Sequence, residues 1–223
     1  MRYYYRRVIP FMTILLIIAN VVCYLYEMKI GLTTTTARYA MYQGALQSGQ
    51  YLRIVTSGFM HFDIFHLLSN MLCLGIYGMM LERSIGSVKF SIIYAVSLLV
   101  GGIAINFVGG NGLHMGASGA IWGLMTATLI YHLKNGISPY YSLRVIIINL
   151  LYTFGAGVSW QGHIGGGIGG LLTALALFKS RPMYSQSYVG YTDQPRRVSE
   201  RSWRRKSNKN DYVEYPDDGR YHP

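Results

Sequence analysis

Charged side chains are scarce through most of this chain. Residues 8–178 hold only ten of the 29 charged residues in the 223-residue sequence, seven of them Lys or Arg and three Asp or Glu. An ordinary soluble domain has about 25% charged residues, so this stretch cannot cover a surface that faces water. The sequence therefore excludes a soluble globular protein, and the runs between the charges are long enough to cross a bilayer core of about 30 Å.

Cysteine is also rare. Cys23 and Cys73 both lie in apolar runs, which excludes a disulfide framework and a cysteine-based metal site. The formal net charge of +11 is concentrated at the two ends of the chain. This distribution favours contact with a lipid bilayer and argues against a nucleic-acid partner.

Six apolar segments predict an all-α fold, a polytopic membrane protein with a six-transmembrane-helix bundle. The first begins like a signal peptide, but no small-residue cleavage site follows, so we expect an uncleaved helix. The 26 glycines fit membrane helices that pack closely. The segments are residues 8–26, 63–81, 88–108, 116–133, 143–158 and 161–178.

The distribution of Lys and Arg predicts the orientation and the division of the chain. With six spans, 17 basic residues fall on the side of the two termini and three fall in the loop 27–62, which indicates an N-in, C-in protein. We expect a basic cytoplasmic arm over residues 1–7, a six-span domain over residues 8–178, and a basic cytoplasmic tail over residues 179–223. The composition of the tail is typical of disorder.

Few polar residues lie inside the predicted spans, and each is a functional candidate by default. His66, Ser118 and His163 each lie 16 residues before the charged residue that ends their span. At 1.5 Å per residue this is about 24 Å above the cytoplasmic edge, so the three residues share one layer near the outer face. The full set, with nearby glycines, is His66 and Asn70; Gly116, Ser118 and Gly119; and His163, Gly166 and Gly170.

Ser118 and His163 are the components of a nucleophile and its general base. Between Asp63 and Lys179 the only carboxylate is Glu82, at the opposite membrane face, so a Ser-His dyad is predicted and a triad with an acid is excluded. The unsatisfied N–H groups at the start of the Ser118 helix can stabilise an oxyanion.

His66 and Asn70 lie four residues apart on one helix face and can add side-chain donors to that site. Binding of a metal by His66 and His163 is the competing interpretation, but it lacks a third ligand, because His61 and His114 belong to outer loops. We therefore predict neither a metal nor a cofactor.

At these residues the sequence resembles the rhomboid family of intramembrane serine proteases, with the motifs in family order across residues 8–178. The matching segments are His61-Phe62 with His66 and Asn70 for the pattern H-x(4)-H-x(3)-N, Gly116-Ala117-Ser118-Gly119 for G-x-S-G, Gly162-His163 with Gly166 and Gly170 for the histidine helix, and Arg53 for the Trp-Arg pair of the first loop.

The resemblance implies that Ser118 is the nucleophile and His163 the base, with His66, Asn70 and the Ser118 N–H at the oxyanion. Gly116 would allow the close approach of the loop before Ser118. The implied reaction is hydrolysis of peptide bonds in or near transmembrane segments of single-span or other membrane proteins. Six spans resemble the basic bacterial form, which implies a plasma-membrane protein with its active site towards the outer face.

Two positions depart from the family pattern. Leu52 stands where the family usually has Trp, and Trp122 stands where it often has Tyr, although Trp122 can still stack on His163. Two other functions stay open: a catalytically inactive rhomboid-like protein that binds membrane clients, and a small-solute transporter. The sequence does not indicate the substrate or the oligomeric state.

Overall fold

The computed structural model describes residues 9–154 and 158–179. Over these ranges the chain is helical, and its only β pairing is an isolated bridge between Met41 and His114. The predicted all-α class is therefore confirmed. The arm 1–7, the tail from residue 180 onward and residues 155–157 of the fifth predicted span lie outside the described residues.

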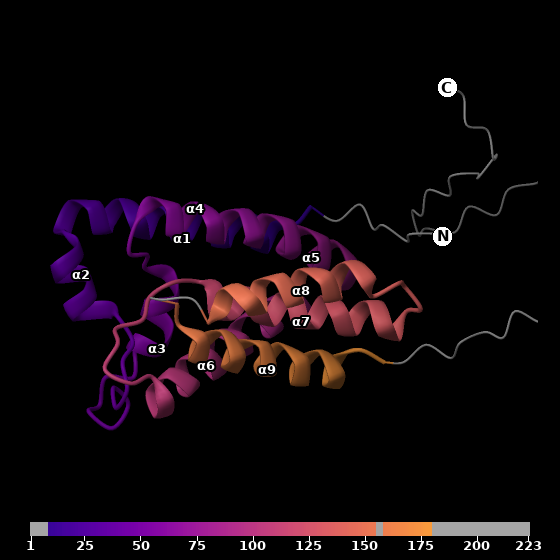
Figure 1. Ribbon diagram of the computed structural model, residues 1–223. Helices are drawn as coiled ribbons and strands as arrows, with labels where there is room; N and C mark the ends of the chain where they lie inside the picture. The colour runs from indigo at the N-terminus through magenta and orange to yellow at the C-terminus, as the bar shows by residue number, and fades with distance from the viewer. Residues whose placement is uncertain (1–8, 155–157, 180–223) are drawn as a thin grey trace, which may run out of the picture.

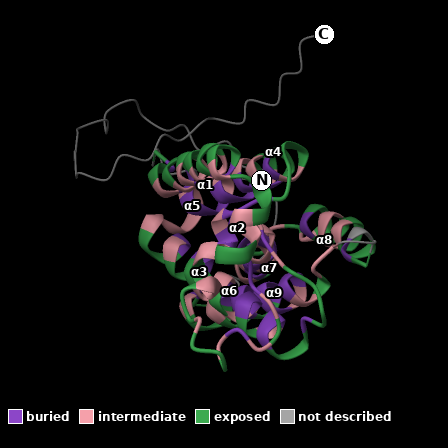
Figure 2. Cartoon of the chain, turned by 90° about the vertical axis from the view of Figure 1, so that its left-hand side faces the viewer, coloured by how far each residue is buried: buried purple, intermediate pink, exposed green. Residues whose placement is uncertain are grey.

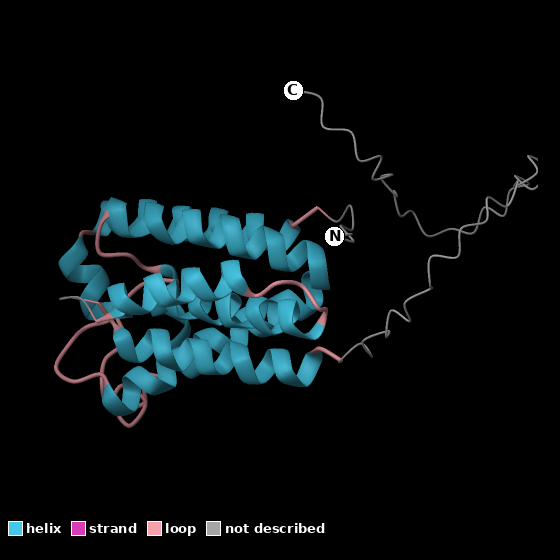
Figure 3. Ribbon diagram, turned by 45° about the vertical axis from the view of Figure 1, so that its right-hand side comes forward, coloured by secondary structure: helices cyan, strands magenta, loops and turns pink. Residues whose placement is uncertain are grey.

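The helices run largely side by side, with the loops gathered at the two ends of the bundle (Figures 1 and 3). Within the described residues they are α1 (Phe11–Ile30), α2 (Leu32–Tyr39), α3 (Arg53–Thr56), the short 3-10 helix η1 (Ser57–Phe59), α4 (Ile64–Cys73), the π-helical turn η2 (Leu74–Gly78), α5 (Met79–Ile85), α6 (Ser87–Val108), α7 (Ser118–Lys134), α8 (Tyr140–Thr153) and α9 (Trp160–Leu177).

Three helical stretches in the described part are long and apolar enough to cross a membrane: α1, the continuous run Ile64–Ile85, and α6. Helices α7, α8 and α9 have 17, 14 and 18 residues. They match the fourth, fifth and sixth predicted segments, while the number of spans stays a prediction.

The predicted end of the first apolar segment, at residue 26, was wrong. Helix α1 continues to Ile30, so Glu27 belongs to this helix and not to the outer loop 27–62. The Glu27 side chain is buried, and its carboxylate accepts hydrogen bonds of 3.0 and 3.1 Å from the His61 backbone N–H. A buried carboxylate needs such donors, and the sequence alone did not reveal them.

Helices α6, α7 and α9 pack against one another and hold many of the buried residues of the bundle (Figure 2). Glycines make this contact very close. A Cβ atom added at Gly101 would lie 2.9 Å from the Gly162 carbonyl oxygen, and one added at Gly170 would lie 2.1 Å from that of Gly123. Main-chain atoms of neighbouring helices therefore touch directly, as small residues allow in membrane bundles.

Helix α1 is fixed to α5 through the buried carboxylate of Glu82. That carboxylate accepts hydrogen bonds from the backbone N–H groups of Met12 and Thr13, at 2.9 and 2.8 Å, and from the Thr13 hydroxyl at 2.6 Å. It satisfies N–H groups that have no partner within the first turn of a helix.

Helix α8 lies at the edge of the bundle (Figure 2). Near its start, the Ser142 hydroxyl lies 2.9 Å from Nδ1 of His132 in α7.

Candidate active site

Ser118 is the first residue of α7, and the loop before it is tightly fixed. The Gly116 N–H donates a 2.9 Å hydrogen bond to the Ser57 carbonyl oxygen. Gly116 has φ +127°, and a Cβ atom at this position would lie 2.8 and 2.9 Å from two atoms of the His66 imidazole. Only glycine fits both the backbone conformation and the space, so the chain before Ser118 passes directly against His66.

His163, in the first turn of α9, faces Ser118 across the contact between the two helices. Its Nε2 atom lies 2.8 Å from the Ser118 Oγ atom, and its side chain is buried. The helices can approach this closely because glycines, which have no Cβ atom, lie at the contact. A Cβ at Gly119 would be 3.0 Å from the Gly162 carbonyl oxygen, and one at Gly166 would be 2.0 Å from the Gly119 carbonyl oxygen. The predicted proximity of Ser118 and His163 thus depends on two glycines, Gly119 and Gly166.

Trp122, one turn after Ser118, stacks on the His163 ring, with centroids 5.7 Å apart and planes inclined by 26°. The indole has no acceptor atom, so it restrains the ring plane and takes no proton.

His66 and Asn70 lie beside the same loop. Asp63 caps α4 by accepting a 2.8 Å hydrogen bond from the His66 N–H. The Asn70 side-chain amide donates a 3.0 Å bond to the His66 carbonyl oxygen, which uses one of its two N–H groups. A Cβ at Gly116 would lie 3.7 Å from the Asn70 amide nitrogen, so both side chains border the segment that leads into Ser118.

His61 packs behind His66, with ring centroids 5.1 Å apart. Its side chain is 1% exposed, and burial lowers the pKa of His61 to about 4. This ring is therefore neutral at physiological pH.

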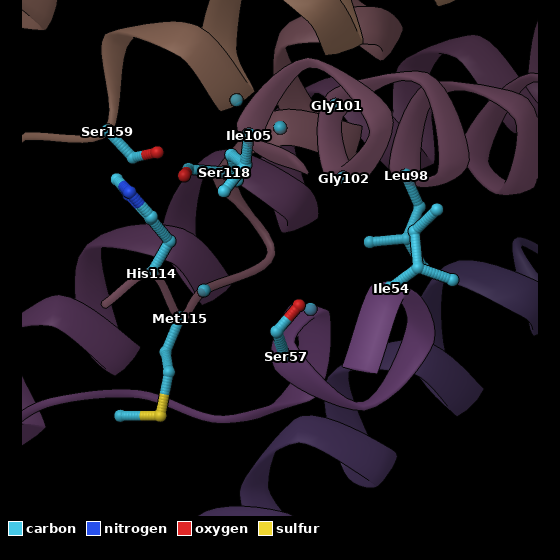
Figure 4. A pocket seen from close by; sticks show the side chains of 14 residues that line it. Ile54, Ser57, Leu98, Gly101, Gly102, Ile105, His114, Met115, Ser118 and Ser159 are labelled. Atoms are coloured by element: carbon cyan, nitrogen blue, oxygen red, sulfur yellow. The ribbon is translucent and has the colours of Figure 1, made fainter. Parts of the chain in front are cut away.

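A pocket opens at Ser118 between the loops before α4 and α7 and the helices α6 and α9 (Figure 4). Its polar side holds His114, Ser118 and Ser159, and its apolar side holds Ile54 and Leu98. The nucleophile candidate therefore borders a cavity that can accept a small group.

Arg53 holds together the long loop between α2 and α4. Its guanidinium donates to the Ala40 carbonyl oxygen at 2.7 Å and to Gln50 Oε1, and it lies over the Tyr42 ring at 5.3 Å from the centroid. The preceding Tyr51 and Leu52 side chains are exposed. The apolar Leu52 side chain is therefore exposed directly before the hydrogen-bonded Arg53.

Within residues 9–154 and 158–179, no three His, Cys, Asp or Glu side chains are grouped as ligands for a metal ion. In the described part of the chain, His66 and His163 therefore lack the third ligand that a metal site would need.

Comparison with known proteins decides the family. The profile of the Rhomboid domain matches residues 48–180, which is more than half of the chain. The chain belongs to the rhomboid family.

Individual relatives agree with this assignment. Rhomboid protease GluP of Bacillus subtilis (strain 168) is 36% identical over 163 residues, which cover 69% of this chain and 32% of GluP. RHOMBOID-like protein 1 of Arabidopsis thaliana is 29% identical over 72% of this chain and 42% of its own length. Rhomboid-like protease 3 of Toxoplasma gondii is 29% identical over 59% of this chain and 54% of its own length. The chain thus spans about a third to a half of these relatives.

One side chain of this rhomboid site was missed in the sequence. The Thr153 Oγ1 atom, at the end of α8, lies 3.0 Å from His163 Nδ1 and is buried. The only signal was a polar pair, Asn149 and Thr153, at helical spacing in the fifth apolar segment. Such residues commonly bond to their own helix, so the pattern did not distinguish Thr153.

Proposed function

We propose that this rhomboid is an intramembrane serine endopeptidase that hydrolyses peptide bonds in or near transmembrane segments of membrane proteins. The observation that carries the proposal is the 2.8 Å hydrogen bond between Ser118 Oγ and His163 Nε2, within a chain of the rhomboid family. A hydroxyl becomes an effective nucleophile when a positioned base can remove its proton.

Acylation begins when Ser118 Oγ attacks the carbonyl carbon of the scissile bond. The Oγ proton passes to His163 Nε2 as the new C–O bond forms, and negative charge moves to the carbonyl oxygen. The backbone N–H of Ser118, at the positive end of α7, is a donor for this oxygen. His66 and Asn70, which border the loop at Gly116, are the proposed side-chain donors.

The intermediate then collapses, and the C–N bond breaks while His163 Nε2 returns its proton to the leaving amine. A water molecule repeats the sequence on the acyl-enzyme, releasing the new carboxyl end and restoring Ser118. Every proton in this cycle passes through His163, so no metal or cofactor is required.

The dyad favours a protease over an inactive protein that only binds membrane clients. A binding role requires neither a serine at a helix N-terminus nor a histidine at hydrogen-bonding distance from it. The apolar helices support residence in a membrane, and the charge pattern supports six spans with both termini inside and the site towards the outer face.

The test uses the purified full chain in detergent micelles with a single-span substrate. We expect cleavage by the wild type, background rates for Ser118→Ala and His163→Ala, and no effect of a chelator. Ser84→Ala is the matched control, because the Ser84 hydroxyl donates to the Met80 carbonyl oxygen of its own helix and lies outside the candidate site. A fluorophosphonate should label the wild type and not Ser118→Ala. Full cleavage by folded Ser118→Ala would refute the proposal.

A further inference from the structure

Thr153 contacts the side of the His163 ring that faces away from Ser118. Its Oγ1 atom lies 3.0 Å from Nδ1, while Ser118 Oγ lies 2.8 Å from Nε2. The Thr153 side chain is 1% exposed, so water does not compete for this contact. The two ring nitrogens of His163 are thus both bound to hydroxyl groups, from α8 and α7.

The direction of the Thr153 bond follows from counting hydrogens. A threonine hydroxyl has one hydrogen to donate, and Thr153 Oγ1 also lies 2.9 Å from the Asn149 carbonyl oxygen, which can only accept. The Thr153 hydrogen therefore goes to Asn149. Towards His163, Oγ1 must act as the acceptor, and Nδ1 must carry the proton.

A proton on Nδ1 leaves the lone pair of neutral His163 on Nε2, where it can accept the Ser118 proton. The opposite tautomer would donate from Nε2 to Ser118 Oγ and could not accept the Ser118 proton. The hydrogen bond made by one ring nitrogen sets the role of the other, so a single buried acceptor favours the tautomer in which the dyad is competent.

We propose that Thr153 is a positioning residue that holds His163 in the Nδ1-protonated tautomer and fixes its ring against Trp122. The inference rests on the proposed function for its catalytic consequence, but the tautomer can be measured without any turnover. Thr153 occupies the place that a carboxylate takes in a Ser-His-Asp triad. Because it is neutral, its contribution is orientation and tautomer selection.

Thr128 offers a matched control. It is also 1% exposed, and its hydroxyl donates 2.8 Å to the carbonyl oxygen four residues earlier, at Leu124. Thr128→Val and Thr153→Val therefore remove the same group from the same kind of environment, and only the latter removes a bond to the histidine.

The experiment combines nitrogen NMR with kinetics on the full chain in detergent micelles. The protein carries ¹⁵N-labelled histidine, His163 is assigned by difference with His163→Gln, and spectra are recorded above the ordinary histidine pKa of about 6.5. Protonated and unprotonated ring nitrogens differ strongly in chemical shift. We expect protonated Nδ1 in the wild type, and a growing Nε2-protonated population in Thr153→Val.

In the cleavage assay, Thr153→Val should lower kcat roughly tenfold, the scale of one neutral hydrogen bond, and leave KM unchanged. Thr153→Ser should restore both the spectrum and kcat, and Thr128→Val should change neither. An Nε2-protonated wild type would overturn the inference even if Thr153→Val did not fold. An unchanged tautomer in folded Thr153→Val would also overturn it. A wild type with the expected tautomer and no cleavage would instead refute the proposed function.

Discussion

Replacing Gly166 by alanine tests whether main-chain contact between α7 and α9 sets the geometry of the dyad. The added Cβ would lie 2.0 Å from the Gly119 carbonyl oxygen, whereas carbon and oxygen atoms normally approach to about 3.3–3.6 Å. The obstacle is backbone, which cannot rotate away, so the helices must separate by roughly 1 Å or more at this level.

This displacement would separate the part of α7 that carries Ser118 from the part of α9 that carries His163. A misplacement of about 1 Å typically costs about 100-fold in rate, and overpacking costs about 1–3 kcal/mol of stability. The higher helix propensity of alanine offsets about 1 kcal/mol of that cost. We therefore expect kcat for Gly166→Ala to fall about 100-fold with a modest decrease in Tm.

Gly167→Ala is the control on the same helix. Its Cβ would meet only the Thr126 methyl group at 3.5 Å and the Trp122 ring at 3.9 Å, which are ordinary contacts. Both variants are assayed for cleavage of a single-span substrate and for thermal unfolding in detergent. Equal kcat and Tm for the two variants would refute the reasoning.

Three further predictions concern other parts of the molecule. His66→Ala and Asn70→Ala should lower kcat, His66→Ala more and by up to about 10²–10³-fold, with little change in KM; a loss that only follows the folded fraction would make both residues structural. Because the pKa of His61 falls to about 4 on folding, the unfolded chain binds an additional proton between about pH 4 and 6.5. The stability of the wild type relative to His61→Phe should therefore decrease as the pH falls through this window, and thermal melts that show no such trend contradict the burial argument. Finally, an impermeant thiol reagent applied outside should label single cysteines placed in residues 30–50 and not in the tail 180–223, and the reverse pattern would invert the proposed orientation.

The helical class and the proximity of Ser118 and His163 could be predicted from the sequence because both follow from simple features of it. Apolar run length identifies helices, and equal distance from a charged end places residues at one depth. Gly166 and Gly170 could be recognised as a close-packing face from their spacing. The structure shows which main-chain atoms of the neighbouring helix each of these glycines contacts.

Other features depend on pairings between distant segments. Glu27 was assigned to the outer loop because a carboxylate normally ends an apolar run, and only the folded chain brings the His61 N–H to it. Helix α7 begins at Ser118 and not at residue 116 because Gly116 adopts φ +127°, outside the helical region. Thr153 was missed because its bond to Asn149 is common in any helix, and nothing local indicates the second bond to His163.

The contact of Gly166 with Gly119 also limits how this protein can recover from mutation. A clash between two side chains can be relieved genetically when the partner mutates to something smaller. Here the atom opposite Gly166 is the carbonyl oxygen of Gly119. A substitution changes only the side chain, and glycine already has the smallest one, so no replacement of Gly119 removes this oxygen. In a selection for restored proteolysis, strains that carry Gly166→Ala should therefore yield true revertants at codon 166 and no second-site suppressors at codon 119.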